Sequence, residues 1–336
     1  MKKKTFHKAL LYWISILIVL FYSYAGAVEL HRTVSHSYSV PTGAQITLMA
    51  GTGRVFITGW DSLDLKIRIT RKVWAETKEQ ANKLIDRMLV KIEEGNNSIL
   101  IRECYGSGKR FRISDLFHRS FWYNMGWNRG SVDYELMIPA YVQLRIACRE
   151  GDVTVQDGQG RGNWIIEADE GDVECNRIRF SGLNIKSEEG DVRLTDLVSI
   201  ESGKLRVRAD EGSIDVTNCH TTDMDIRSEE GNVDLKNSRS LRFKIFSKEG
   251  DIKAGFSPLK QGQYYVGSDE GSIHIAIPAT SNLAFQARTK EGIIRSDFNL
   301  LQDMIKSGKQ SSGTVGLSEA FLKANTIEGN IGIMRW

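Results

Sequence analysis

The sequence contains few of the residue patterns that catalytic and metal sites require. It has only four cysteines and six histidines, and they form no CxxC or Cys/His spacing that would predict a metal site. It also has no glycine-rich phosphate loop, no HExxH zinc motif and no Ser-His-Asp triad order. These absences argue against the common hydrolase and nucleotide-binding classes, and we expect a protein that is not an enzyme.

An excess of charge of one sign is also absent. The formal net charge is +3, but residues 1–27 contain four lysines and no acid, so the remainder carries a net charge of −1. The sequence pI of about 8.5 therefore gives no indication of a nucleic-acid partner, and none is expected.

Residues 1–27 have the three parts of a signal peptide. Basic residues Met1–Lys4 precede an apolar run from Ala9 to about Tyr24, and Ala25–Ala27 forms a small-residue cleavage site. An uncleaved membrane anchor is the alternative, although the run is shorter than the roughly 20 residues that span a bilayer. No cysteine follows the run, so a lipoprotein is not expected. We predict export to the periplasm or the cell surface.

The dominant feature is a Glu-Gly pair that occurs nine times between Glu150 and Gly329, each copy in the same hydrophobic pattern. Apolar residues stand six and four positions before the glutamate, a small residue two before, and Val or Ile three after it. This period of two predicts strands on both sides of a turn. Copies from Glu150 to Glu291 recur every nineteen to twenty-two residues, and a degenerate copy over Ile46–Ile57 has Thr52 in place of the glutamate.

Such a repeat predicts an all-β fold, because one copy cannot bury its apolar face and neighbours must stack. We expect a parallel β-solenoid (β-helix) of about nine coils over residues 141–336; a sandwich or propeller of hairpins is the alternative. The invariant glycine suits a turn with positive φ, and the Asp, Asn or Ser that follows it can bond turn backbone. Cys148 and Cys175 occupy inward positions and are expected to be small core residues, whereas the pairing of Cys104 and Cys219 stays open.

Residues 28–140 are expected to form an N-terminal β-rich cap that contains one α-helix. The stretch from Ala75 to Glu94 combines helix-forming residues with an amphipathic pattern, between segments with strand periodicity. A helix at this point predicts a cover for the open end of the solenoid.

The segment 105–130 breaks the pattern, with seven aromatic residues and a net charge of +4. It predicts a contact surface for an envelope protein, a polysaccharide or an anionic membrane surface. The alternative is that these rings pack over the mouth of the solenoid. The candidate partner-binding residues are Phe111, Arg112, Phe117, Arg119, Phe121, Trp122, Tyr123 and Trp127.

If the coils stack in register, the repeat glutamates form a ladder along one edge. Neighbouring carboxylates would repel by about 1 kcal/mol even in water. Three interpretations are open: shared Ca²⁺ or a cationic ligand, local pairing with Lys186, Arg208, Arg227 and Arg288, or simple exposure to solvent. No cofactor or metal is required. The candidate cation-binding residues are Glu150, Glu170, Glu189, Glu211, Glu230, Glu249 and Glu270.

Taken together, the run Gly51–Asp61, the helix from Ala75, Ile138–Pro139 and the Glu-Gly-Asp-Val coils resemble the bacterial DUF4097 family of candidate adhesins. The resemblance implies a right-handed β-helix in an exported or envelope-associated protein, with some relatives linked to envelope stress. The regular glutamate and the segment 105–130 depart from the family pattern.

We therefore expect an exported, non-enzymatic, adhesin-like β-solenoid that mediates binding or scaffolding at the bacterial cell envelope. The alternatives are an envelope-stress sensor or regulatory protein, and a calcium-dependent enzyme acting on polysaccharides. The enzyme is disfavoured because glycoside cleavage needs carboxylates in separate roles, whereas these acids repeat uniformly. The ligand and the oligomeric state stay open.

Overall fold

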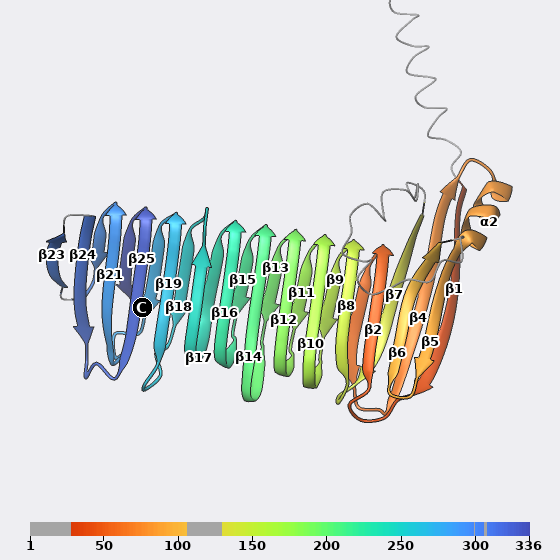
Figure 1. Ribbon diagram of the computed structural model, residues 1–336, viewed down its shortest axis with the longest axis horizontal. Helices are drawn as coiled ribbons and strands as arrows, with labels where there is room; N and C mark the ends of the chain where they lie inside the picture. The colour runs from red at the N-terminus through yellow and green to blue at the C-terminus, as the bar shows by residue number, and fades with distance from the viewer. Residues whose placement is uncertain (1–27, 106–129, 299, 306–307) are drawn as a thin grey trace, which may run out of the picture.

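The computed structural model describes residues 28–105, 130–298, 300–305 and 308–336. Two facing β-sheets run along an elongated stack of coils, and the described residues contain one helix, α2, at the β1 end (Figure 1). The expected all-β solenoid is confirmed.

Each regular coil contributes one strand to each sheet. A longer strand ends at the repeat glutamate and joins the sheet that we call sheet B, and a shorter strand begins three residues later and joins sheet A. In spatial order, sheet B contains β5 (Met88–Gly95), β6 (Ser98–Tyr105), β2 (Gln45–Thr52), β8 (Gln143–Glu150), β10 (Gln159–Glu170), β12 (Arg179–Glu189), β14 (Val198–Glu211), β16 (His220–Glu230), the second part of β17 (Val233–Ser247), β19 (Gln263–Glu270), β25 (Ala320–Glu328), β21 (Leu283–Glu291), β24 (Gly308–Val315) and β23 (Leu300–Ile305).

Sheet A is built in the same way. In spatial order, it contains β1 (Val28–Ser39), β4 (Asp64–Ala75), β7 (Gly130–Pro139), β3 (Val55–Trp60), β9 (Val153–Gln156), β11 (Val173–Asn176), β13 (Val192–Thr195), β15 (Ile214–Thr217), the first part of β17, β18 (Ile252–Phe256), β20 (Ile273–Ile277), β26 (Ile331–Arg335) and β22 (Ile294–Ser296).

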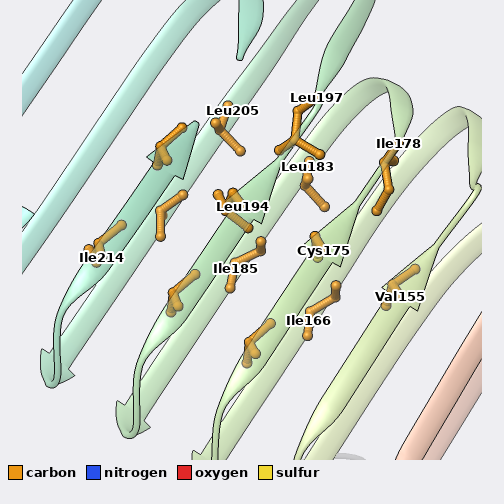
Figure 2. Close-up of a cluster of buried hydrophobic side chains, with 14 of the residues drawn as sticks. Val155, Ile166, Cys175, Ile178, Leu183, Ile185, Leu194, Leu197, Leu205 and Ile214 are labelled. Atoms are coloured by element: carbon orange, nitrogen blue, oxygen red, sulfur yellow. The ribbon is translucent and has the colours of Figure 1, made fainter. Parts of the chain in front are cut away.

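The core lies between the two sheets and consists of columns of like side chains. Ile166, Ile185 and Val207 stand four residues before successive glutamates, lie side by side in sheet B and are fully buried. Leu194 of sheet A belongs to the same cluster (Figure 2). The apolar positions of the repeat are therefore the inward positions, as the period of two predicts.

The glycine column brings successive turns into direct contact. Gly212 has a φ of +128°, and a Cβ there would lie 2.3 Å from the carbonyl oxygen of Gly190 in the neighbouring coil. A side chain at this position would therefore meet backbone that cannot move aside. The glycine is required by both the turn and the close approach of the coils.

Polar side chains beside the glycine tie one coil to the next. The Oδ1 atom of Asp172 accepts a hydrogen bond from the backbone N–H of Asp191 at 3.0 Å, and equivalent bonds recur along the stack. On the inward side, the buried Ser247 hydroxyl donates to the Gly231 carbonyl at 2.8 Å. The predicted bonds to turn backbone therefore run between coils.

The order of coils in space differs from their order in the sequence at both ends. The coil β25–β26 inserts between β19–β20 and β21–β22. At the other end, β2 lies between β6 and β8, and β3 lies between β7 and β9. Neither end is therefore a simple continuation of the repeat.

The N-terminal cap contains the expected helix, but its predicted end was wrong. Helix α2 (Lys78–Arg87) begins after Thr77, whose Oγ1 accepts from the Gln80 N–H, and it buries Ala81 and Ile85. The residues that follow form β5, because they pair with β6 across a two-residue turn at 96–97. Pairing with a neighbouring strand determines the secondary structure of this segment, although its residues favour a helix. Among the described residues, no helix is long and apolar enough to cross a membrane.

All four cysteines lie in the described part of the chain, and none forms a disulfide. Cys148, Cys175 and Cys219 are buried. Burial raises the pKa of each of these three thiols to about 12. They are core residues rather than nucleophiles, as expected for Cys148 and Cys175.

Replacing Gly212 by alanine should destabilise the protein by roughly 1–3 kcal/mol, the usual range for an overpacked site. Unfolding in urea, followed by circular dichroism, measures the change. Gly255→Ala is the matched control, because a Cβ there approaches nothing closer than 3.3 Å. Equal losses in both variants would contradict the role assigned to the turn contact.

Candidate functional site

Two of the predicted features lie outside the described residues. They are the signal peptide over residues 1–27 and the eight candidate partner-binding residues between Phe111 and Trp127. Both therefore stay predictions. The predicted glutamate ladder, in contrast, lies within the described part of the chain.

The repeat glutamates form an acidic ridge where sheet B turns into sheet A. Glu170 aligns with Glu150 on one side and with Glu189 on the other, as the repeat predicts. At the C-terminal end, Glu328 stands between Glu270 and Glu291, because β25 inserts there. The members of the ridge from Glu170 onward are exposed to solvent, whereas Glu150 is half-buried.

Local ion pairs neutralise only part of this ridge. Glu150 pairs with Arg149 at 2.5 Å and Glu249 pairs with Lys248 at 3.1 Å. Lys186 and Arg227, expected to pair with the glutamates three residues later, instead bind Glu188 and Asp225. The reason is geometric: residues two apart share a face of a strand, whereas residues three apart do not.

One carboxyl group beside the ridge, that of Asp169, has a raised pKa. Partial burial, reinforced by the negative charge of Glu188, raises the pKa of Asp169 to about 6. Lys186 and Arg149 oppose this effect only in part. At neutral pH Asp169 is therefore ionised, and its charge destabilises the folded protein.

The described residues contain no group of three or more His, Cys, Asp or Glu side chains that is placed to hold a metal ion. The calcium interpretation of the ridge therefore gains no support from the structure and stays a prediction. The exposure of these carboxylates agrees with the interpretation of a solvated edge.

A second feature, which the sequence reading missed, lies on the outer face of sheet B. It is an open groove of about 870 Å³, which we call the basic groove, running across strands β14, β16, β17, β19 and β25. Its charged lining residues are five cations and two carboxylates, a net charge of +3: Lys204, Arg206, Arg242, Lys244, Lys323, Asp223 and Asp225.

Aromatic side chains complete the lining of the basic groove. Tyr265 lies against the outer surface of its own strand, because a Cβ at Gly267 would be 2.7 Å from the Tyr265 hydroxyl. The Nζ atom of Lys244 is 5.7 Å from the centre of this ring. Phe321, on the neighbouring strand β25, is 45% exposed.

The repeat contains a signal that would have located the groove. Its outward residues stand five and seven positions before each glutamate. On neighbouring strands, the first row is Arg206, Asp225, Lys244, Tyr265 and Lys323, and the second is Lys204, Asp223, Arg242, Gln263 and Phe321. The inward positions carry similar side chains in every coil and therefore indicate the fold. The side chains at the outward positions differ between coils, and these differences locate the groove.

Replacing Asp169 by asparagine should stabilise the protein at pH 7.5 by about 1 kcal/mol, after allowance for solvent screening. The raised pKa means that the folded state holds the proton between pH 3.8 and about 6. The stability that this proton confers is present at low pH and lost as the pH rises through about 6. The difference in melting temperature between variant and wild type should therefore grow from pH 4 to pH 7.5.

Asp269→Asn is the matched comparison, because Asp269 also immediately precedes a repeat glutamate. A pH profile that is the same for both variants would contradict the role of the surroundings of Asp169.

Several solved structures resemble the chain. They include a candidate adhesin from Bacteroides fragilis (13% identity, TM-score 0.38, 91% of this chain and 97% of that chain covered) and one from Parabacteroides merdae (9%, 0.37, 90% and 96%). A candidate lipid-binding protein from Parabacteroides distasonis also matches (10%, 0.33, 91% and 97%). With TM-scores below 0.5, these structures support no inference about what the chain binds.

No curated protein matches the chain. The model of the family described as Toastrack DUF4097 matches residues 91–334, well over half of the sequence, in agreement with the resemblance carried by the repeat. The chain belongs to the Toastrack DUF4097 family.

Proposed function

We propose that the protein is an exported, non-enzymatic binding protein that acts as an adhesin-like scaffold at the bacterial cell envelope. The observation that carries the proposal is the basic groove. It is an open surface with a net charge of +3 and an exposed ring, built on a regular stack of strands. Exposed cations and aromatic rings in a concave surface are typical of sites that bind anionic ligands.

The solenoid is suited to hold such a surface in a fixed shape. Each coil is tied to its neighbours by backbone pairing, by buried apolar columns and by side-chain bonds such as Asp172 to Asp191. Binding sites built on strands have better defined geometry than sites on loops. A ligand that meets the outer face of sheet B would therefore find a preorganised surface.

The chemistry of the groove favours binding over catalysis. The Arg242 guanidinium donates two hydrogen bonds to Asp223 and lowers the pKa of that carboxyl group. Asp223 is therefore ionised at neutral pH and is poorly suited to act as a general acid. Asp169, the carboxyl group with a raised pKa, does not line the groove.

The full chain with an affinity tag should fractionate with the cell envelope or periplasm of a bacterial host. Immunoblotting of the separated fractions measures its distribution, with a version lacking residues 1–27 as the control that stays in the cytoplasm. Recovery of the full chain in the cytoplasm alone would contradict the proposed location. Failure of the exported chain to sediment with isolated envelopes would contradict envelope binding.

The aromatic and basic segment 105–130 is proposed as a second contact surface, because Arg and aromatic side chains suit anionic and interfacial partners. Replacing residues 106–129 by a Gly/Ser linker of equal length should reduce sedimentation with envelopes severalfold at physiological salt. A circular dichroism spectrum like that of wild type shows that the solenoid is retained. Unchanged sedimentation would remove this segment from the proposal.

A further inference from the structure

We propose that the basic groove binds a linear acidic polysaccharide, that is, a sugar chain whose rings carry carboxylates. The proposal rests on the binding function proposed above and specifies the class of ligand and the site. Three properties of the groove support it: cations outside ion pairs, an aromatic ring beside them and an elongated shape.

The cations of the groove are available to a ligand. Both carboxylates are already paired: Asp223 with Arg242, at 2.5 and 2.8 Å, and Asp225 with Arg227, at 3.2 Å. No carboxylate of the described residues forms an ion pair with the remaining cations, which are Lys204, Arg206, Lys244 and Lys323. Lys204 also acts on the neighbouring Asp223 through its charge, and the net charge of +3 that remains in the groove favours the entry of an anion.

The floor of the groove offers an aromatic surface for sugar rings. The ring of Tyr265 lies across Gly267, where only a glycine leaves room for it. Sugar rings have faces made of C–H groups, and these faces pack on flat aromatic rings. The Tyr hydroxyl and the amide of Gln263, which also lines the groove, provide hydrogen-bonding groups for sugar hydroxyls.

The shape of the groove fits a polymer better than a small molecule. It crosses five neighbouring strands of sheet B, which corresponds to roughly 19 Å along the stack at the usual strand spacing. The strand spacing of about 4.8 Å is comparable to the length of one sugar unit. A chain that runs along the stack would therefore present successive rings to successive strands.

The cations of the groove suit carboxylate and phosphate alike. Arg242 is held by both oxygens of Asp223, which leaves Arg206 as the one guanidinium of the groove without a carboxylate partner among the described residues. Arginine matches carboxylate and phosphate equally well in bidentate geometry, and lysine binds either as a point charge. The choice of a carboxylated sugar chain therefore rests on the aromatic ring and on the length of the groove. Nucleic acids and anionic membranes are therefore treated as outcomes that would overturn the proposal.

The order of the terminal coils creates this lining. If the coils were stacked in sequence order, β21 would lie beside β19 and would place Ala284 and Gln286 next to Gln263 and Tyr265. The inserted strand β25 instead places Phe321 and Lys323 there. An exposed ring and a cation therefore replace a methyl group and an amide at this end of the groove.

The test measures binding of polygalacturonate to the exported form of the chain by isothermal titration calorimetry. Fully methyl-esterified polygalacturonate is the matched neutral ligand. We expect binding of the acidic polymer, weakening with added salt, and at least tenfold weaker binding of the neutral one. Lys244→Glu and Tyr265→Ala should each weaken binding about tenfold or more, whereas Tyr265→Phe should retain most of it.

Lys253→Glu is the matched control, because Lys253 is an exposed lysine in β18 of sheet A, away from the groove. It should bind as wild type does, and melting temperatures show that every variant is folded. Absence of polygalacturonate binding, or equal binding by Lys244→Glu and Lys253→Glu, would overturn the proposal. Tighter, groove-dependent binding of poly(dT) or of anionic lipid vesicles would also overturn it.

These outcomes are separable from the broader proposal. If the wild-type chain sediments with envelopes but does not bind polygalacturonate, the polysaccharide assignment fails and the envelope function stands. If the chain does not associate with envelopes at all, the broader function fails.

Discussion

The contact between glycines of successive turns is the constraint on which the rest of the structure depends. Because the Gly212 turn lies against the Gly190 carbonyl, with no space for a Cβ, each coil can follow its neighbour in only one register. The core positions on both sides of the turn are then stacked on their equivalents, and the register shifts only in the segments that join one coil to the next. The apolar core columns, the hydroxyl bonds to glycine carbonyls and the Asp ladder between turns all follow from that single alignment.

The same alignment makes the positions of the repeat differ in the residue types that they accept. Inward positions accept a charge only where it is hydrogen-bonded, since a buried, unpaired ion has a large desolvation cost. The buried Glu103, for example, accepts hydrogen bonds from the Gly51 N–H and the Tyr134 hydroxyl. The glutamate position can carry a repeated charge because most of its members are exposed and water screens them. The outward positions of sheet B are free to vary, so a surface with a particular charge and shape arises there without change to the core.

Much of the fold could be predicted because its determinants are local and repeated. The inward columns and the register of Glu150 with Glu170 follow from spacing alone. The end of helix α2 could not be predicted in this way, because pairing of β5 with β6 decides it. The basic groove was missed because it combines outward residues that differ between coils, such as Tyr265 and Phe321. The role of segment 105–130 stays a prediction.

The insertion of the last coil links these observations. Repeats of nearly equal shape can exchange neighbours at little cost in packing, because each offers the same inward columns and the same glycine turn to the next. The coil β25–β26 is therefore able to enter between β19–β20 and β21–β22 with the glutamate register intact. Its outward residues, however, are not equivalent to those of β21. The exchange is possible because the inward side chains are alike in all coils. Because the outward side chains differ, the same exchange alters the surface and places Lys323 beside Tyr265.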